Sequence, residues 1–194
     1  MTTPTLCLIA LLVAPVALAS PPEPKGPIAP PAARPEGSLS RIPSGFRGIM
    51  GQVYVGEPAP GFELTSADEK RVKLSSFTGD RVLLCFADRR ETLSQYRAAA
   101  DSLRALGVRL IGIARDSPRS LRTLAERDSL SFMLLSDPTG EISAIYGSYD
   151  FATSSIRPGY VLVDRTSIVR MLLLGQKLPP NDLLQITHYA LAGI

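Results

Sequence analysis

Apolar and polar residues alternate in two short stretches near the start of the foldable part of the chain. These stretches are residues 62–65 and 71–74, and a polar turn over residues 67–70 separates them. This period of two predicts a β-hairpin with one solvated face. Arg81–Phe86 then forms a continuous apolar run of strand length. Such a run is typical of a central strand that is buried on both faces.

A longer-period pattern follows and predicts a helix that ends at Gly107, because glycine readily terminates helices. Its apolar positions are Leu93, Tyr96, Ala99, Ala100, Leu103 and Leu106. Residues 108–114 form a second buried strand. The next helix is predicted to begin at Ser117, whose hydroxyl can cap it, with Pro118 in the first turn.

The remaining elements complete an alternating series. A short strand is predicted over residues 132–135 and a short helix over 139–146. Residues 159–164 and 167–174 form a closing hairpin, and a last helix begins at Pro180. Strands that alternate with helices predict an α/β sandwich, in which a central mixed β-sheet is flanked by helices.

The chain is divided into two N-terminal segments and one folded domain. Residues 1–19 resemble a secretory signal peptide with a cleavage point after Ala19, because a short apolar run ends in small residues. The run is shorter than the about 20 residues that span a membrane, so we expect no transmembrane span in the mature chain. Residues 20–51 are rich in proline and glycine and are interpreted as a disordered tether, or alternatively as a proline-recognition ligand. Residues 52–194 form the domain.

The signal peptide predicts a secreted or periplasmic protein, which would be membrane-tethered if the signal stayed uncleaved. Net charge is +3, and acidic and basic residues are interspersed, so the composition does not favour nucleic-acid binding. Export would leave Cys85 as the single cysteine, so no internal disulfide is expected. With His188 as the one histidine, no zinc or iron ligand cluster and no cofactor is predicted.

Several short motifs, taken in order, are similar to those of the peroxiredoxin family, the alkyl hydroperoxide reductase and thiol-specific-antioxidant group of the thioredoxin fold. The resemblance covers residues 53–192 and is greatest to the bacterioferritin-comigratory-type branch. The motifs are residues 55–62, 72–74, 77–79, 107–113, 116–118, 134–137 with Gly140, Tyr146-Gly147, and Arg157 ahead of residues 160–164. The resemblance implies a thioredoxin-like, peroxiredoxin-type sandwich and thiol-dependent peroxide reduction.

The resemblance also locates a site after the first long strand. In the family this site reads Pro-x-x-x-Thr-x-x-Cys, with an arginine from a later strand; the cysteine thiolate attacks the peroxide. The corresponding residues here are Asp88, Thr92 and Gln95, with Arg157 as the arginine. Gln95 cannot replace a thiolate as a nucleophile, and no cysteine follows Phe86, so we expect the peroxidase activity to be lost.

Residues 92–95 also fit a capping box, in which Thr92 and Gln95 would bond each other's backbone N–H groups at a helix start. Arg157 would then need a counter-charge in place of the thiolate, and Asp88 and Glu91 are the candidates. Cys85, inside an apolar run, is interpreted as core packing, with a redox role as the alternative. His188 is interpreted as a surface or interface residue.

Three functions remain open from the sequence. The favoured hypothesis is a non-catalytic module that acts by binding or assembly, as a homodimer or with a protein partner. The second is an antioxidant oxidoreductase that reduces peroxide through Cys85 or through a partner's thiol. The third, a thioredoxin-like disulfide carrier, requires a Cys-x-x-Cys motif that is missing near Ser94.

Overall fold

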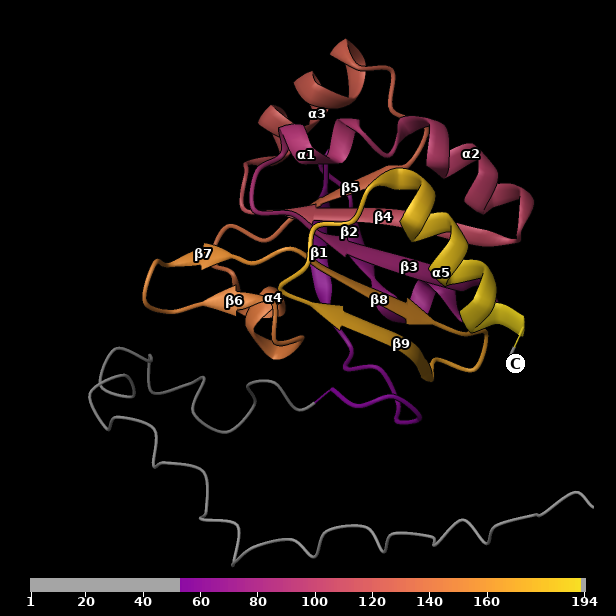
Figure 1. Cartoon of the computed structure of the whole chain (residues 1–194). Helices are drawn as coiled ribbons and strands as arrows, with labels where there is room; N and C mark the ends of the chain where they lie inside the picture. Colours follow the sequence, from indigo (N-terminus) through magenta and orange to yellow (C-terminus); the bar gives the residue numbers. More distant parts are fainter. Residues whose placement is uncertain (1–52, 193–194) are drawn as a thin grey trace, which may run out of the picture. The chain divides into compact units, whose positions relative to one another are not determined.

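The computed structural model describes residues 53–192, so the signal peptide and tether predicted over residues 1–51 lie outside the described part (Figure 1). The strands are β1 (Glu63–Ser66), β2 (Arg71–Lys73), β3 (Arg81–Phe86), β4 (Val108–Ala114), β5 (Met133–Ser136), β6 (Tyr149–Asp150), β7 (Ser155–Ile156), β8 (Gly159–Val163) and β9 (Val169–Leu174). The helices are the 3-10 helix η3 (Leu74–Phe77) and α1 (Glu91–Ser94), α2 (Arg97–Ala105), α3 (Pro118–Arg127), α4 (Glu141–Ile145) and α5 (Pro180–Ala192).

Seven of these strands form one mixed sheet in the order β2-β1-β5-β4-β3-β8-β9. Strands β3, β4 and β5 are parallel, while β8 runs antiparallel to β3, and β9 to β8. At the other side β1 is antiparallel to both β5 and β2. The predicted α/β sandwich around a mixed sheet is therefore confirmed.

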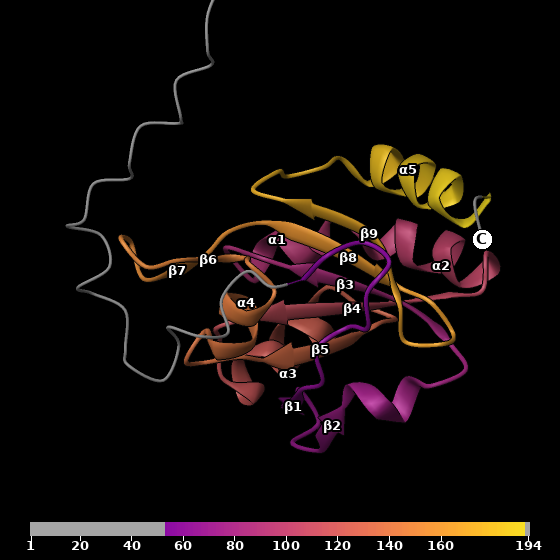
Figure 2. The same ribbon diagram turned by 90° about the horizontal axis from the view of Figure 1, so that it is seen from below.

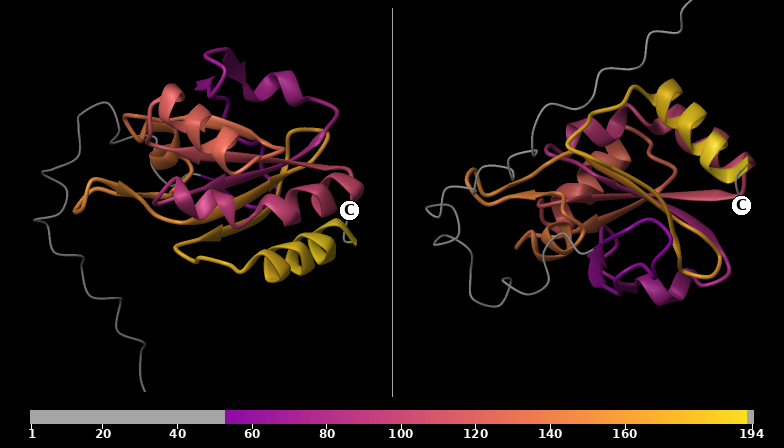
Figure 3. Two further views of the ribbon diagram at one scale, coloured as in Figure 1. Left: turned by 90° about the horizontal axis from the view of Figure 1, so that it is seen from above. Right: turned by 60° about the horizontal axis from the view of Figure 1, so that its bottom comes forward.

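Two apolar clusters fill the two faces of the sheet. One cluster packs the sheet against α2, α3 and α5 and contains Cys85, and the other packs it against η3 and α4. Helices α2 and α5 lie side by side over the first face in Figures 1 and 2, and Figure 3 shows the same pair from two further directions. Cys85 is thus covered by helices and by its neighbouring strands.

Most of the local predictions hold. The apolar runs at residues 81–86 and 108–114 are the central strands β3 and β4, and every β3 residue after Arg81 is buried. Ser117 caps α3 by accepting a hydrogen bond from the Ser120 N–H at 3.3 Å, and Pro118 is the first helical residue. Gly107 ends α2 with a φ of 72°, a conformation that suits glycine.

Two features differ from the prediction. The helix expected from Leu93 onwards is divided into α1 and α2, because Gln95 and Tyr96 lie between them and Tyr96 leaves helical geometry at ψ 5°. The hairpin of β6 and β7 was not predicted, and it projects beyond the end of the main sheet (Figure 1). Among residues 53–192 no helix combines the length and hydropathy that crossing a membrane demands.

Candidate functional site

The loop after β3 and the short helix α1 occupy the position where the resemblance locates a reactive site. The predicted capping box is wrong, because α1 begins at Glu91 and Thr92 already lies inside it. The Thr92 N–H donates to the Arg89 carbonyl at 3.0 Å, so it belongs to the first turn. Gln95 follows the last residue of α1 and closes the helix instead of initiating it. The helix starts early because Arg90 already has helical φ and ψ.

Thr92 instead links a carboxylate to an ammonium group. Its hydroxyl donates to Asp88 Oδ1 at 3.2 Å and accepts from Lys177 Nζ at 3.3 Å. Lys177 comes from the connection between β9 and α5, 85 positions away in sequence. Lys177 could not be predicted from the sequence, because no motif connects that segment with the loop. The cationic side chain bonded to Thr92 is therefore a lysine from the C-terminal segment.

Arg157 does not meet the carboxylates predicted for it. It is exposed after β7, and within the described residues neither Asp88 nor Glu91 forms an ion pair with it. Glu91 pairs with the Nε of Arg90 at 2.9 Å. Hydrogen bonds, first from the Ala152 backbone N–H, lower the pKa of Asp150, and the charge of Arg157 contributes to this. The predicted counter-charges are wrong because the β6–β7 hairpin brings Arg157 near its own Asp150.

Helix α1 is fixed to α3 at both of its ends (Figure 1). Arg90 donates to Asp116 Oδ1 at 2.8 Å and to the Ser120 hydroxyl. The Ser94 hydroxyl donates to Asp128. Hydrogen bonds from the Arg127 guanidinium, together with that from Ser94, lower the pKa of Asp128. The loop that would carry the chemistry is therefore held in one position by polar contacts.

Two buried tyrosines, Tyr96 between α1 and α2 and Tyr160 of β8, lie next to each other. The Tyr96 and Tyr160 hydroxyls are 2.6 Å apart, and Tyr96 also donates to the Leu178 carbonyl at 2.8 Å. Burial, followed by the bond to Tyr160, raises the pKa of Tyr96, while the side-chain amide of Gln95 opposes this by hydrogen bonding. The exposed Gln95 therefore takes part in a hydrogen-bond network of uncharged groups, which also contains Tyr96, Tyr160 and the Leu178 carbonyl.

Cys85 lies in β3 between Gly112 of β4 and Tyr160 of β8, and 2% of its surface is exposed. Burial raises the pKa of its thiol from 9.0 to about 12. Reactive cysteines need solvent access and a neighbouring positive charge that stabilises the thiolate. Cys85 is instead surrounded by apolar side chains and neutral phenols, so the predicted packing role is supported.

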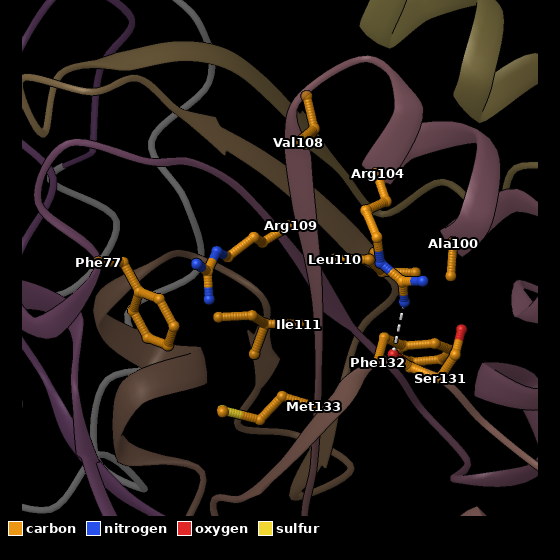
Figure 4. Close-up of a pocket in the computed structure, with 10 residues that line it drawn as sticks. All are labelled: Phe77, Ala100, Arg104, Val108, Arg109, Leu110, Ile111, Ser131, Phe132 and Met133. Carbon is orange, nitrogen blue, oxygen red and sulfur yellow. Dashed lines mark hydrogen bonds between the residues drawn. The ribbon is translucent and has the colours of Figure 1, made fainter.

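The described residues offer no metal centre, because no three of their His, Cys, Asp and Glu side chains gather closely enough to hold an ion. His188 is exposed on α5, in agreement with its predicted surface position. A pocket of about 430 Å³ lies away from the α1 loop, beside the first residues of β4 (Figure 4). Because β3 and β4 are parallel, this pocket is at the opposite end of the sheet from the loop.

Comparison with known proteins agrees with this fold. The sequence model of the AhpC/TSA family matches residues 55–172, which is more than half of the chain. The chain belongs to the AhpC/TSA family. The peroxiredoxin resemblance and the thioredoxin-like fold class are thereby confirmed.

Individual relatives support the same family. Peroxiredoxin Bcp of Escherichia coli is 34% identical over 104 residues, which cover 50% of this chain and 67% of that protein. The chloroplastic peroxiredoxin Q of Populus jackii is 30% identical over 143 residues, covering 70% of this chain and 67% of that protein. The crystal structure of peroxidoxin BcpB from Mycobacterium tuberculosis matches with a TM-score of 0.64 at 20% identity, covering 74% of this chain and 99% of that one.

Within this AhpC/TSA domain, the residues at the four family positions do not form one cluster. Thr92 donates a hydrogen bond to Asp88, and the side chain of Gln95 is hydrogen-bonded to Tyr96. Arg157 lies close enough to Asp150 for its charge to act on that carboxylate. The one thiol of the fold, Cys85, lies in the strand before the loop and not in the loop itself. The arrangement can hold a helix in place, but among the described residues it brings no thiol next to a cationic group.

Proposed function

We propose that this AhpC/TSA domain is non-catalytic and acts by binding a protein partner or a second copy of itself. The burial of Cys85 carries this proposal. It is the single cysteine from residue 8 to residue 194, 2% of its surface is exposed, and its pKa is raised to about 12. The thiolate is the form that attacks peroxide, and a thiol with this pKa stays protonated at neutral pH.

The loop after β3 supports the same proposal. Gln95 stands where the family resemblance requires the reactive cysteine, and its amide has no nucleophilic electron pair of useful basicity. The threonine of the site, Thr92, is engaged by Asp88 and Lys177. Because the single hydrogen of this hydroxyl is already donated to Asp88, Thr92 has no donor left for a peroxide oxygen.

The alternative is a peroxide reductase that works through Cys85 or through a thiol supplied by a partner. The relatives favour it, since the two compared above carry the name peroxiredoxin. For Cys85 to react, β3 would have to expose a residue that its two neighbouring strands, β4 and β8, and the helices on that face of the sheet now cover. A partner thiol would have to reach the loop between Asp88 and Gln95.

A peroxide-consumption assay with a thiol reductant separates these functions. The unmodified chain and Cys85→Ser are expected to consume hydrogen peroxide equally slowly, at the rate of the reductant alone. Rapid consumption that disappears in Cys85→Ser would establish the reductase through Cys85. Consumption that requires a partner extract and survives in Cys85→Ser would establish the partner-thiol alternative.

Export is a further part of the proposal, and it rests on residues 1–19. The apolar run ending in Ala17-Leu18-Ala19 supports a signal that is cleaved before Ser20. Mass spectrometry of the protein recovered outside the cytoplasm is expected to give a chain that begins at Ser20. A full-length chain in the cytoplasmic fraction would contradict export, and a full-length chain in the membrane fraction would indicate an uncleaved anchor.

A further inference from the structure

The two faces of the main sheet are covered to different extents. The first face carries α2, α3 and α5, which have 9, 10 and 13 residues. The second face carries η3 and α4, with 4 and 5 residues, and the coil that begins at Val53. Ile142 and Ile145 of α4 and Leu172 of β9 pack on this second face but stay half-buried. The second face therefore keeps apolar surface that the elements on it do not fully cover.

The coil before β1 lies between α4 and β9 on this second face. The hydroxyl of Tyr146, directly after α4, donates to the Pro60 carbonyl at 2.6 Å. The Gly56 N–H donates to the Val169 carbonyl of β9 at 2.8 Å. Val53 is 5% exposed and belongs to the same apolar cluster as Tyr146 and Val169. The part of the chain that precedes Val53 therefore leaves from this incompletely covered face.

Exposed apolar side chains adjoin this point of exit. Tyr54 is 59% exposed and Val55 is 60% exposed, directly after the buried Val53. Contiguous apolar surface on a soluble protein usually marks a site that another segment or molecule covers. The half-buried Ile145 and Leu172 flank the coil on its two sides. An occupant is therefore expected next to the position where the chain leaves the domain.

The residues just before Val53 carry a matching apolar pattern. Phe46, Ile49 and Met50 precede Val53 by seven, four and three positions. Residues with this spacing share one side of a helix. A chain advances at most about 3.6 Å per residue, so Met50 can lie no further than about 11 Å from Val53, and Phe46 no further than about 25 Å. All three side chains are thus within reach of the cluster that holds Val53.

We propose that residues 46–50 fold back on the second face and cover its apolar surface between α4 and β9. The three apolar side chains of this segment would contact Ile145 and Leu172, next to the buried Val53. The proposed tether would then be flexible as far as about residue 45, and its last residues would belong to the domain. This inference goes beyond the proposed function, and it holds whether or not the domain is catalytic.

The covalent connection favours this segment over a separate molecule as the occupant. A segment held by a short link has an effective concentration on the order of millimolar, so a second copy or a partner has to displace it. Gly48 and Gly51 each disfavour a helix by about 1 kcal/mol relative to alanine. The segment is therefore expected to gain its order from the contact with the face and not from its own helix propensity.

The test is nuclear magnetic resonance of the purified chain, which contains residues 46–50 whether or not the signal is cleaved. Backbone nitrogen relaxation should show residues 46–50 to be as rigid as β9, and residues 21–35 to be flexible. If residues 46–50 are as flexible as residues 21–35, the inference is wrong. This measurement uses the unmodified chain, so it does not depend on the folding of any variant.

A leader variant then identifies the surface that is covered. The triple variant Phe46→Ser/Ile49→Ser/Met50→Ser should make the segment flexible and shift the methyl signals of Ile145 and Leu172. These two residues are distant from the substitutions in sequence, so a shift reports a contact in the fold. The methyl signals should not change on dilution, because the contact is within one chain.

The matched control is Ile28→Ser, which replaces an apolar residue in the proline-rich part of the leader and should leave both methyl signals unchanged. Leu121, on the other face of the sheet, reports that each variant remains folded. Identical methyl signals of Ile145 and Leu172 in the triple variant and the unmodified chain would overturn the inference. Signals that change on dilution would also overturn it, because a second copy would then cover the face. Neither result bears on peroxide consumption, so failure here is distinguishable from failure of the non-catalytic assignment.

Discussion

The hydroxyl groups of Tyr96 and Tyr160 lie 2.6 Å apart in the interior, and their rings meet edge to face with centroids 6.1 Å apart. The Leu178 carbonyl accepts from Tyr96 at 2.8 Å, and the Leu178 N–H donates to Tyr160 at 2.9 Å. One network therefore joins the residue before α2, strand β8 and the connection between β9 and α5. This is the same connection that places Lys177 on Thr92.

Removing one hydroxyl from this pair should destabilise the fold. Tyr96→Phe leaves the Leu178 carbonyl without its donor and the Tyr160 hydroxyl without its acceptor, so the free energy of unfolding should fall by about 1–3 kcal/mol. Urea unfolding followed by circular dichroism measures this. Tyr189→Phe is the control, because Tyr189 is 68% exposed, and it should change stability by less than about 0.5 kcal/mol. Equal stability of both variants would show that the network contributes little.

The sequence predicted the fold well because its strands and helices differ in period and in terminating residues. Continuous apolar runs marked β3 and β4, and Ser117, Pro118 and Gly107 marked helix ends. Each of these signals is local, so it needs no knowledge of the partner strands. The β6–β7 hairpin was missed because Tyr149–Asp150 and Ser155–Ile156 are too short to show any period.

The site was predicted less well, because its contacts join distant segments. The Thr92 bond to Lys177 spans 85 positions and the Tyr96 bond to Tyr160 spans 64. The capping box failed because its sequence pattern does not record that Arg90 is already helical. The order of strands in the sheet also depends on tertiary packing, which a single sequence does not specify.

A second prediction concerns the close approach of β4 to α1. A Cβ added at Gly112 would lie 2.9 Å from a Leu134 methyl carbon and 3.0 Å from a Leu93 methyl carbon. Gly112→Ala should therefore lower the free energy of unfolding by about 1–3 kcal/mol, because it overpacks the core. Gly61→Ala is the matched control, since nothing lies within 4 Å of its added Cβ. A thermal melt of Gly112→Ala that matches that of Gly61→Ala would show that the two leucines move aside.

A third prediction concerns acid stability and Asp164. Burial alone raises the pKa of this carboxyl, but hydrogen bonds from the Ile168 N–H, from Thr166 and from Arg170 outweigh it and lower the pKa from 3.8 to about 2. The folded-state pKa is depressed, so the stabilisation is present above pH 4 and is lost as pH falls through about 2. Asp164→Asn should cost about 1–2 kcal/mol at pH 7.

Urea unfolding of Asp164→Asn and the unmodified chain between pH 7 and pH 2 checks this. The difference in stability should be constant down to pH 4 and should narrow below it. Asp68→Asn, at an exposed position, is the control and should show no difference at any pH. If the two proteins still differ by the same free energy of unfolding at pH 2, the stabilisation does not come from the ionised carboxylate of Asp164.

A fourth prediction follows from the raised pKa of Cys85. The thiol titrates near 9.0 in its unperturbed state and at about 12 in the fold, so the folded state retains its proton more strongly. The resulting stabilisation is complete below pH 9 and is lost as pH rises from 9 towards 12. At pH 8 the folded chain should react with a thiol-specific disulfide reagent far more slowly than the urea-unfolded chain. Equal rates in both states would mean that Cys85 is accessible in the native fold.

Whether Cys85 reacts with peroxide is tested most directly by intact-protein mass spectrometry of the chain exposed to dilute hydrogen peroxide, with a cysteine peptide in the same tube. We expect Cys85 to gain oxygen more slowly than the peptide, because a protonated and covered thiol is a poor nucleophile. Oxygen uptake at Cys85 that is much faster than in the peptide, and that is absent in Cys85→Ser, would contradict a non-catalytic domain and support a peroxidase that works through Cys85.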